Sequence, residues 1–203
     1  MLGPTLNLSE SYIQLAHFED VIELQIPISH EELNKVEYNW HPYGTDPKRY
    51  RFGCSILSLD GSDTGEIDLR PLWVYNKENK TKLLEMDFNI PTKHSTPFAY
   101  FLEKFDCGRS HYMKLEKGGH FLWHRDHGFD SFRIIYTIDG CDPLNFVWIQ
   151  DNTVVPLQNK KWYYINTKRK HCVFSFKETK FAIFNVEISQ KNIDNMMFHM
   201  PIS

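Results

Sequence analysis

The chain has 203 residues, a net charge of −3, and near-average fractions of apolar (41%) and charged (24%) residues. This length fits one domain with its own core, and the composition excludes a disordered or collagen-like chain. The charge excludes a sequence-independent nucleic-acid binder, because no global basic field exists to condense on phosphates. Aromatic residues reach 15%, and with ten glycines and ten prolines they favour a β-rich protein with many turns.

The N-terminal end shows no targeting pattern. No Lys or Arg precedes Lys35, and no apolar run is long enough to span a membrane. We therefore expect a cytoplasmic protein without a membrane partner. The four cysteines show no C-x-x-C spacing, so reduced and mostly buried thiols are expected at Cys54, Cys107, Cys141 and Cys172.

Residues 1–108 are predicted to mix strands with two helices. The run HFEDVIELQIPI at 17–28 predicts a strand. Ser29 and Glu32 then have the spacing of a capping box, which predicts a short helix that ends near Trp40.

A second strand and a second helix complete this part of the chain. The run FGCSILSL at 52–59 predicts the strand. The helix is expected to begin at Ser95 or Thr96, with Pro97 in its first turn, and to end by Gly108. No internal repeat or linker divides the sequence, so residues 1–203 are interpreted as one domain.

From Ser110 onward the pattern changes to short β-prone runs separated by turns. The runs cover residues 111–116, 121–126, 132–138, 145–150, 153–157, 161–166, 171–176 and 180–188. Turn signals such as Gly118-Gly119 and Asp139-Gly140 lie between them. Eight short strands at close spacing predict a mainly β fold, a double-stranded β-helix of the jelly-roll or cupin type over 109–190, with the N-terminal helices packed on it.

His124, Asp126 and His171 are the candidate metal ligands. Residues two apart on a strand face the same way, so the run 121–126 directs an imidazole and a carboxylate at one point. His171 begins a later strand, and an antiparallel return would bring it beside this pair. Two imidazoles and one carboxylate leave open positions on an octahedral metal, as in the facial triad of non-haem Fe(II) oxygenases. Histidines that only support the structure are the alternative interpretation.

Two basic residues are candidates for binding an anionic cosubstrate. An oxygenase that uses 2-oxoglutarate must neutralise the distal carboxylate of this molecule inside the barrel, which requires a cation. Lys180 heads an apolar strand row that we expect to face inward, namely Ala182, Phe184, Val186 and Ile188. Arg133 follows His124 on the next strand, and its planar fork suits a carboxylate, but the pattern does not fix its direction. Either residue, or both, can serve as the clamp.

Beyond these motifs, the sequence resembles the Fe(II)/2-oxoglutarate-dependent oxygenases, and within them the aspartyl/asparaginyl β-hydroxylase-like branch. The resemblance rests on residues 109–140 and 170–188, is weaker over 50–61, and covers a little over half of the chain. In this branch a glycine turn precedes the metal-binding His. An Arg follows on the next strand, and a second Arg, which contacts 2-oxoglutarate, follows the distal His.

The resemblance carries over residue by residue. His124, Arg133 and His171 match the pattern of the branch. Lys180 stands where the branch has its second Arg, and Asp126 supplies a carboxylate that some members lack. The resemblance also implies that Tyr112, on the strand before the glycine turn, gives its hydroxyl to the cosubstrate.

Together these features lead to the hypothesis of an Fe(II)/2-oxoglutarate-dependent dioxygenase that hydroxylates a C–H bond. Its cofactor would be Fe(II), its cosubstrates 2-oxoglutarate and O₂, and its prime substrate a peptide Asp or Asn side chain or a small molecule. Two alternatives belong to other classes. One is a cupin-like metalloenzyme that does not use 2-oxoglutarate, and the other is a non-catalytic β-sandwich binding module.

Overall fold

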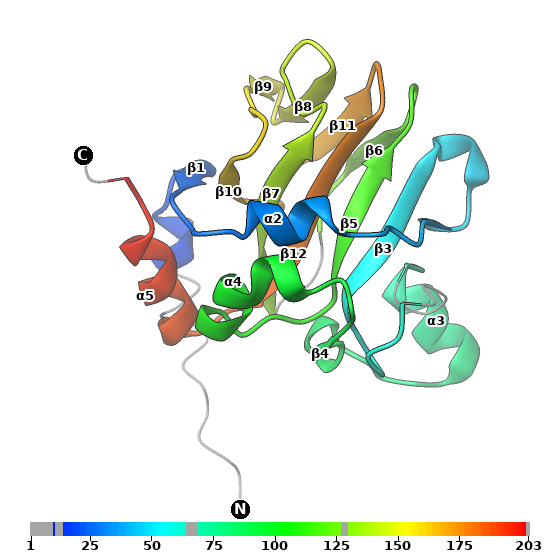
Figure 1. Cartoon of the computed structure of the whole chain (residues 1–203), viewed down its shortest axis with the longest axis horizontal. Helices are drawn as coiled ribbons and strands as arrows, with labels where there is room; N and C mark the ends of the chain where they lie inside the picture. The colour runs from blue at the N-terminus through cyan, green and yellow to red at the C-terminus, as the bar shows by residue number, and fades with distance from the viewer. Residues whose placement is uncertain (1–9, 11–13, 64–68, 127–129, 202–203) are drawn as a thin grey trace, which may run out of the picture.

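The computed structural model describes residues 10, 14–63, 69–126 and 130–201 (Figure 1). Its strands are β1 (Val21–Leu24), β2 (His41–Pro42), β3 (Arg51–Ser58), β4 (Ile90–Pro91), β5 (Ser110–Leu115), β6 (His120–His124), β7 (Ser131–Asp139), β8 (Phe146–Gln150), β9 (Thr153–Val155), β10 (Trp162–Ile165), β11 (His171–Ser175) and β12 (Thr179–Glu187). Its helices are α2 (His30–Asn34), α3 (Leu72–Asn79), α4 (Ala99–Lys104) and α5 (Gln190–Phe198), with 3-10 turns η1 (Pro47–Arg49), η2 (Glu85–Asp87) and η3 (Thr96–Phe98). No helix in this part of the chain is long and apolar enough to cross a membrane.

Strands β5 to β12 form a double-stranded β-helix. The large sheet has the order β1-β10-β7-β12-β5-β3-β2, with β4 paired to β3, and the small sheet has the order β6-β11-β8-β9. The chain passes back and forth between the two sheets, so that β5, β7, β10 and β12 lie in the large sheet and β6, β8, β9 and β11 in the small one. The predicted fold class and the eight predicted strands are confirmed.

The large sheet is covered on both faces by different layers. One face packs against η3 and α4, where Phe98 and Phe101 meet Tyr112 and Phe184 of the strands (Figure 1). The other face looks toward the small sheet and carries a second apolar cluster, which includes Met113, Leu115, Ile135, Phe146, Trp148, Val173 and Phe181. Because side chains alternate along a strand, each strand of the large sheet contributes to both cores.

The helices differ in part from the prediction. Ser29 caps α2 and accepts from the Glu32 backbone N–H, as the capping pattern predicts, but the helix ends at Asn34 instead of near Trp40. The chain extends after Lys35, and the Tyr38 and Trp40 rings stack on each other with centroids 4.8 Å apart. The second predicted helix is present as η3 followed by α4.

Helices α3 and α5 lie outside the prediction. Helix α3 has no buried residue, so no apolar stripe marks it in the sequence. Helix α5 lies after the last strand, which corrects the expectation that the helices belong to the N-terminal half. Ser189 caps α5 through the Asn192 backbone N–H, and Ile193 and Met196 are buried. All four cysteines are reduced and buried, as expected.

Candidate metal centre

The pairing of β6 with β11 brings two histidines together. His171 is the cross-strand partner of His124, and the centroids of the two imidazole rings lie 4.2 Å apart. A register shift follows, because Val173 pairs with Phe121. This bulge leaves one extra residue in β6 and lets both Phe121 and His124 face the same cavity.

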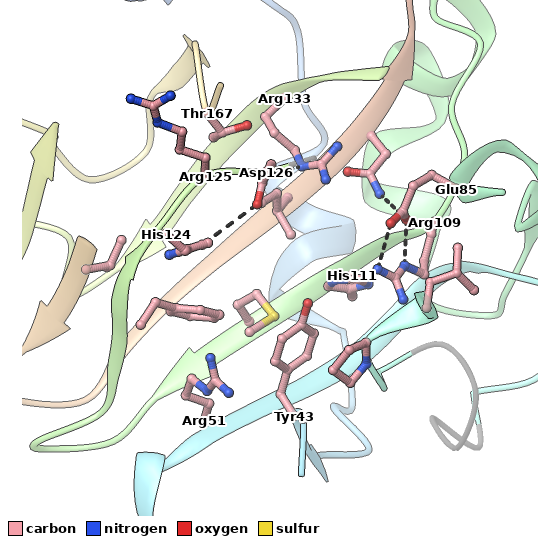
Figure 2. Close-up of a pocket in the computed structure, with 18 of the residues that line it drawn as sticks. Tyr43, Arg51, Glu85, Arg109, His111, His124, Arg125, Asp126, Arg133 and Thr167 are labelled. Carbon is pink, nitrogen blue, oxygen red and sulfur yellow. Dashed lines mark hydrogen bonds and ion pairs between the residues drawn. The ribbon is translucent and has the colours of Figure 1, made fainter. Parts of the chain in front are cut away.

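Asp126 completes the group just beyond the end of β6. Its backbone N–H donates to the Thr167 carbonyl over 3.0 Å, which fixes the chain at this point. One carboxylate oxygen, Oδ1, lies 3.7 Å from Nε2 of His124 (Figure 2). One potential ligand atom from each of His124, Asp126 and His171 lies within 4.8 Å of the others, so the structure brings the predicted triad together.

Hydrogen bonds to the backbone fix which nitrogen of each imidazole faces the cavity. Nδ1 of His124 lies 2.7 Å from the Leu122 carbonyl oxygen, and Nδ1 of His171 lies 3.0 Å from the Arg169 carbonyl oxygen. A carbonyl only accepts, so each Nδ1 carries a proton, and Nε2 is the nitrogen of each ring that is left for a metal. This is the arrangement that metal-binding histidines adopt in proteins, and the donor set fits a two-His, one-carboxylate metal site.

The surroundings of Asp126 favour its ionised form, which is the form that binds a metal. Burial works to raise the pKa of Asp126, but the positive charge of Arg133 is the main opposing effect, and the pKa lies below the usual value. Nε of Arg133 is 3.2 Å from Oδ2 of Asp126. Burial lowers the pKa of His171, which favours its neutral form. The Trp148 ring stacks on His171 at 5.2 Å with an interplanar angle of 7° and limits its rotation.

The triad opens into a cavity of about 860 Å³ between the two sheets. Arg133 lines this cavity, as the sequence predicts for a cosubstrate-binding residue. A volume of this size is typical of a small-molecule site. Its mouth carries the exposed side chains of Trp73, Leu84, Leu122 and Trp123.

Lys180 and Tyr112 do not line the cavity, which corrects the positions expected for them. Lys180 pairs with Glu178 at 2.9 Å, and the fully buried Tyr112 donates its hydroxyl to the His94 carbonyl over 2.9 Å. The apolar row after Lys180 packs toward the helices, and the cavity instead receives the opposite row of β12, namely Phe181, Ile183 and Asn185. The more apolar face of β12 therefore packs in the core that contains Phe98 and Phe101 of η3 and α4. The face that lines the cavity is less apolar because it carries Asn185.

Several cavity residues escape prediction from the sequence. Arg109 is buried and forms a two-bond pair with Glu85, with Nε–Oε2 at 2.7 Å and Nη2–Oε1 at 2.9 Å. Asn185 donates to the same carboxylate over 2.8 Å. His111 is 4% exposed, and its Nδ1 has no hydrogen-bond partner among the described residues. Burial and the charges of Arg109 and Arg133 hold the pKa of His111 well below its usual value, so the ring is neutral.

Comparisons with known proteins give no match to a family model or to a curated sequence. Among solved structures, a 2OG-Fe(II) oxygenase family oxidoreductase from Burkholderia pseudomallei is 12% identical, with 90% of each chain covered and a TM-score of 0.47. A cupin-2 domain protein from Shewanella frigidimarina is 19% identical, covering 39% of this chain and 70% of that one, with a TM-score of 0.32. A conserved protein of unknown function from Streptococcus pyogenes is 11% identical, covering 40% of this chain and 64% of that one, with a TM-score of 0.33.

Proposed function

We propose that this protein is an Fe(II)/2-oxoglutarate-dependent oxygenase that hydroxylates a C–H bond. The observation that carries the proposal is the triad itself. Two imidazole Nε2 atoms and one carboxylate, each held by its own backbone or arginine contact, face one point of an 860 Å³ cavity. Such a donor set leaves half of an octahedral coordination sphere for other ligands, as in non-haem iron oxygenases.

Each residue of the centre has a distinct task in this proposal. His124, Asp126 and His171 hold Fe(II). Arg133 pairs with Oδ2 of Asp126, which leaves Oδ1 for the metal, and its position in the cavity supports a role in binding the chelating end of 2-oxoglutarate. The rings of Phe121 and Trp148 pack against His124 and His171 and line the cavity beside the triad.

When they are bound, Fe(II) and 2-oxoglutarate supply the oxidising chemistry, in which O₂ gives one oxygen atom to succinate and one to the hydroxylated product while CO₂ is released. The chain supplies geometry and charge. For the prime substrate we propose an Asp or Asn side chain of a peptide, after the resemblance to the β-hydroxylase-like branch, with a small metabolite as the alternative. The exposed Trp73 and Trp123 at the mouth support a substrate that extends beyond the cavity.

The test measures metal binding first. His171→Ala removes one of three ligands, so its affinity for Mn(II) should fall at least about 100-fold. His120→Ala is the matched control. His120 lies on the same strand as His124 but does not line the cavity, and its Nδ1 contacts the Gly118 carbonyl oxygen. Equal Mn(II) binding by wild type and His171→Ala would remove this triad from consideration.

The second measurement is succinate release. Wild-type protein with Fe(II), ascorbate and 2-oxoglutarate should form succinate slowly without a prime substrate, and Asp126→Ala should not. A protein that binds iron at the triad yet forms no succinate would favour the cupin-like metalloenzyme without 2-oxoglutarate. A protein that binds no metal would favour the binding module.

A further inference from the structure

Arg51 places a cation inside the cavity from a strand outside the double-stranded β-helix. It is the first residue of β3, which pairs with β5, and its side chain lines the cavity. Cζ of Arg51 lies 4.3 Å from the Phe121 ring centroid and 5.4 Å from that of Tyr43. Figure 2 shows Arg51 and Tyr43 at the opposite end of the view from Arg133 and Asp126. Both the Phe121 ring and the Tyr43 ring lie within cation–π distance of the guanidinium.

This guanidinium lacks the carboxylate partner that the other two buried arginines of the cavity have. Arg109 is compensated by Glu85 and Arg133 by Asp126. Within the described ranges, no carboxylate lies within ion-pair distance of Arg51, and its buried Nε has no hydrogen-bond partner. Partial burial of a cation that has no ion-pair partner destabilises the folded protein. An anionic ligand that pairs with Arg51 would offset this cost, which favours its binding.

The local backbone accommodates this position of the arginine. Gly44 has φ +82°, and a Cβ on it would lie 2.9 Å from Nη2 of Arg51. A side chain at position 44 would therefore crowd the guanidinium. Burial lowers the pKa of Arg51, but an arginine keeps its charge in proteins, so the cation persists.

The Phe121 ring lies between the metal site and Arg51 in the chain of contacts. Phe121 contacts both partners, because its ring centroid lies 6.0 Å from that of His124 and 4.3 Å from Cζ of Arg51. The two distances put Cζ of Arg51 at most about 10 Å from the His124 ring centroid. An extended five-carbon dicarboxylate bound to a metal at His124 would reach across a separation of this size with its far end. Strand β12 offers no cation for that end, since Phe181 faces the cavity and Lys180 does not.

We propose that Arg51 binds the distal carboxylate of 2-oxoglutarate through its guanidinium edge. This inference rests on the proposed function. Arg133 then serves the chelating end of the same molecule, and the two arginines have separable roles. A planar guanidinium held between aromatic rings matches the geometry of a carboxylate, with which it forms two parallel hydrogen bonds.

The experiment compares two 2-oxo acids on Mn(II)-loaded protein under nitrogen by calorimetry. 2-Oxobutyrate has the same chelating end as 2-oxoglutarate and a hydrogen in place of the distal carboxylate. Arg51→Met should lower the affinity for 2-oxoglutarate at least tenfold and change the affinity for 2-oxobutyrate less than twofold. Arg51→Lys keeps the charge without the fork and should lie between Arg51→Met and wild type. Lys180→Met is the control that tests the rival cation, and it should bind 2-oxoglutarate as wild type does.

Each other outcome overturns a defined part of the argument. If Arg51→Met and Arg51→Lys bind 2-oxoglutarate as wild type does, the distal carboxylate lies elsewhere, and loss in Lys180→Met would place it at that residue. If Arg51→Met weakens both acids equally, Arg51 acts on the shape of the metal site. If wild-type Mn(II) protein binds neither acid, the proposed function fails, and this inference fails with it. Equal thermal unfolding midpoints of the variants establish that they are folded.

Discussion

At the scale of single residues, Glu85 is the carboxylate that pairs with the buried Arg109 in the cavity. Its carboxylate accepts two hydrogen bonds from Arg109 and one from Asn185, and the side chains of Glu85 and Arg109 are 14% and 9% exposed. Arg109 also donates from Nη1 to the Arg70 carbonyl. Glu85 therefore links η2 to Arg109, which directly precedes β5, and to Asn185 of β12.

Glu85→Gln should strongly destabilise the fold, because it removes the negative charge that accepts two hydrogen bonds from the buried Arg109. We expect the free energy of unfolding in urea to fall by about 3 kcal/mol. Glu31→Gln is the control, since the ion pair of Glu31 with Lys35 is exposed and should contribute no more than about 0.5 kcal/mol. Similar losses in the two variants would show that the Glu85 pair is not desolvated.

The residues of the triad could be predicted from the sequence, whereas Arg51 could not. His124 and Asp126 are two apart on one strand, so their common direction follows from local geometry alone. The position of His171 beside them could be predicted on the single assumption that its strand returns antiparallel to the strand of His124. Arg51 enters the cavity because β3 pairs with β5 outside the barrel, a long-range contact that no local pattern encodes. Glu85 and Arg109 likewise meet only after folding.

At the scale of elements, the turn between β5 and β6 sets the position from which the triad strand begins. Gly118 has φ +84°, with open space where a Cβ would lie. Gly119 is different, because a Cβ there would lie 2.7 Å from the Tyr50 carbonyl oxygen and 2.8 Å from that of Glu116. The backbone of this turn also pairs with Ser175 of β11.

These two glycines should respond differently to the same substitution. Gly118→Ala should cost about 1–2 kcal/mol in the free energy of unfolding, which is the penalty of a left-handed residue. Gly119→Ala forces backbone apart and should cost about 3 kcal/mol, and it should also weaken Mn(II) binding by shifting β6. Urea unfolding and Mn(II) titration of both variants measure this. A larger stability loss in Gly118→Ala would contradict the assignment.

The sequence analysis assigned the wrong face of β12 to the interior of the barrel. The row Ala182, Phe184 and Val186 is apolar throughout, and a barrel interior was expected to be the more apolar side. In the structure this row packs on the helices, and the cavity face of β12 carries Asn185. A face that builds a polar site has fewer apolar residues than a face that only packs, so apolarity alone assigns the two faces in reverse order.

At the scale of the whole molecule, the large sheet separates two apolar cores, one packed against the helices and one facing the small sheet. The helix-side core is rich in rings, with Phe98 contacting Tyr112, Tyr136, Trp162 and Phe184. The inner core supports the cavity between the sheets. The high aromatic fraction in the composition therefore reflects a thick packed layer behind the site, which lets the cavity hold charged side chains without loss of the fold.

Ligand binding at this cavity should raise the stability of the whole fold, because the triad and the arginines come together only in the folded chain. A ligand at 100 times its Kd stabilises by about 2.7 kcal/mol, which corresponds to an increase in Tm of about 5–10 °C for a chain of this length. Mn(II) alone should raise the Tm of wild type, and 2-oxoglutarate should raise it further only when Mn(II) is present, since chelation needs the metal.

Two variants serve as controls for this measurement. His171→Ala should show neither increase, and His120→Ala should show both. Mn(II) is the suitable probe, because it is the weakest binder of its series and has the least affinity for histidines of the unfolded chain. An increase with 2-oxoglutarate that does not depend on Mn(II) would show that the anion binds at the arginines without a metal centre.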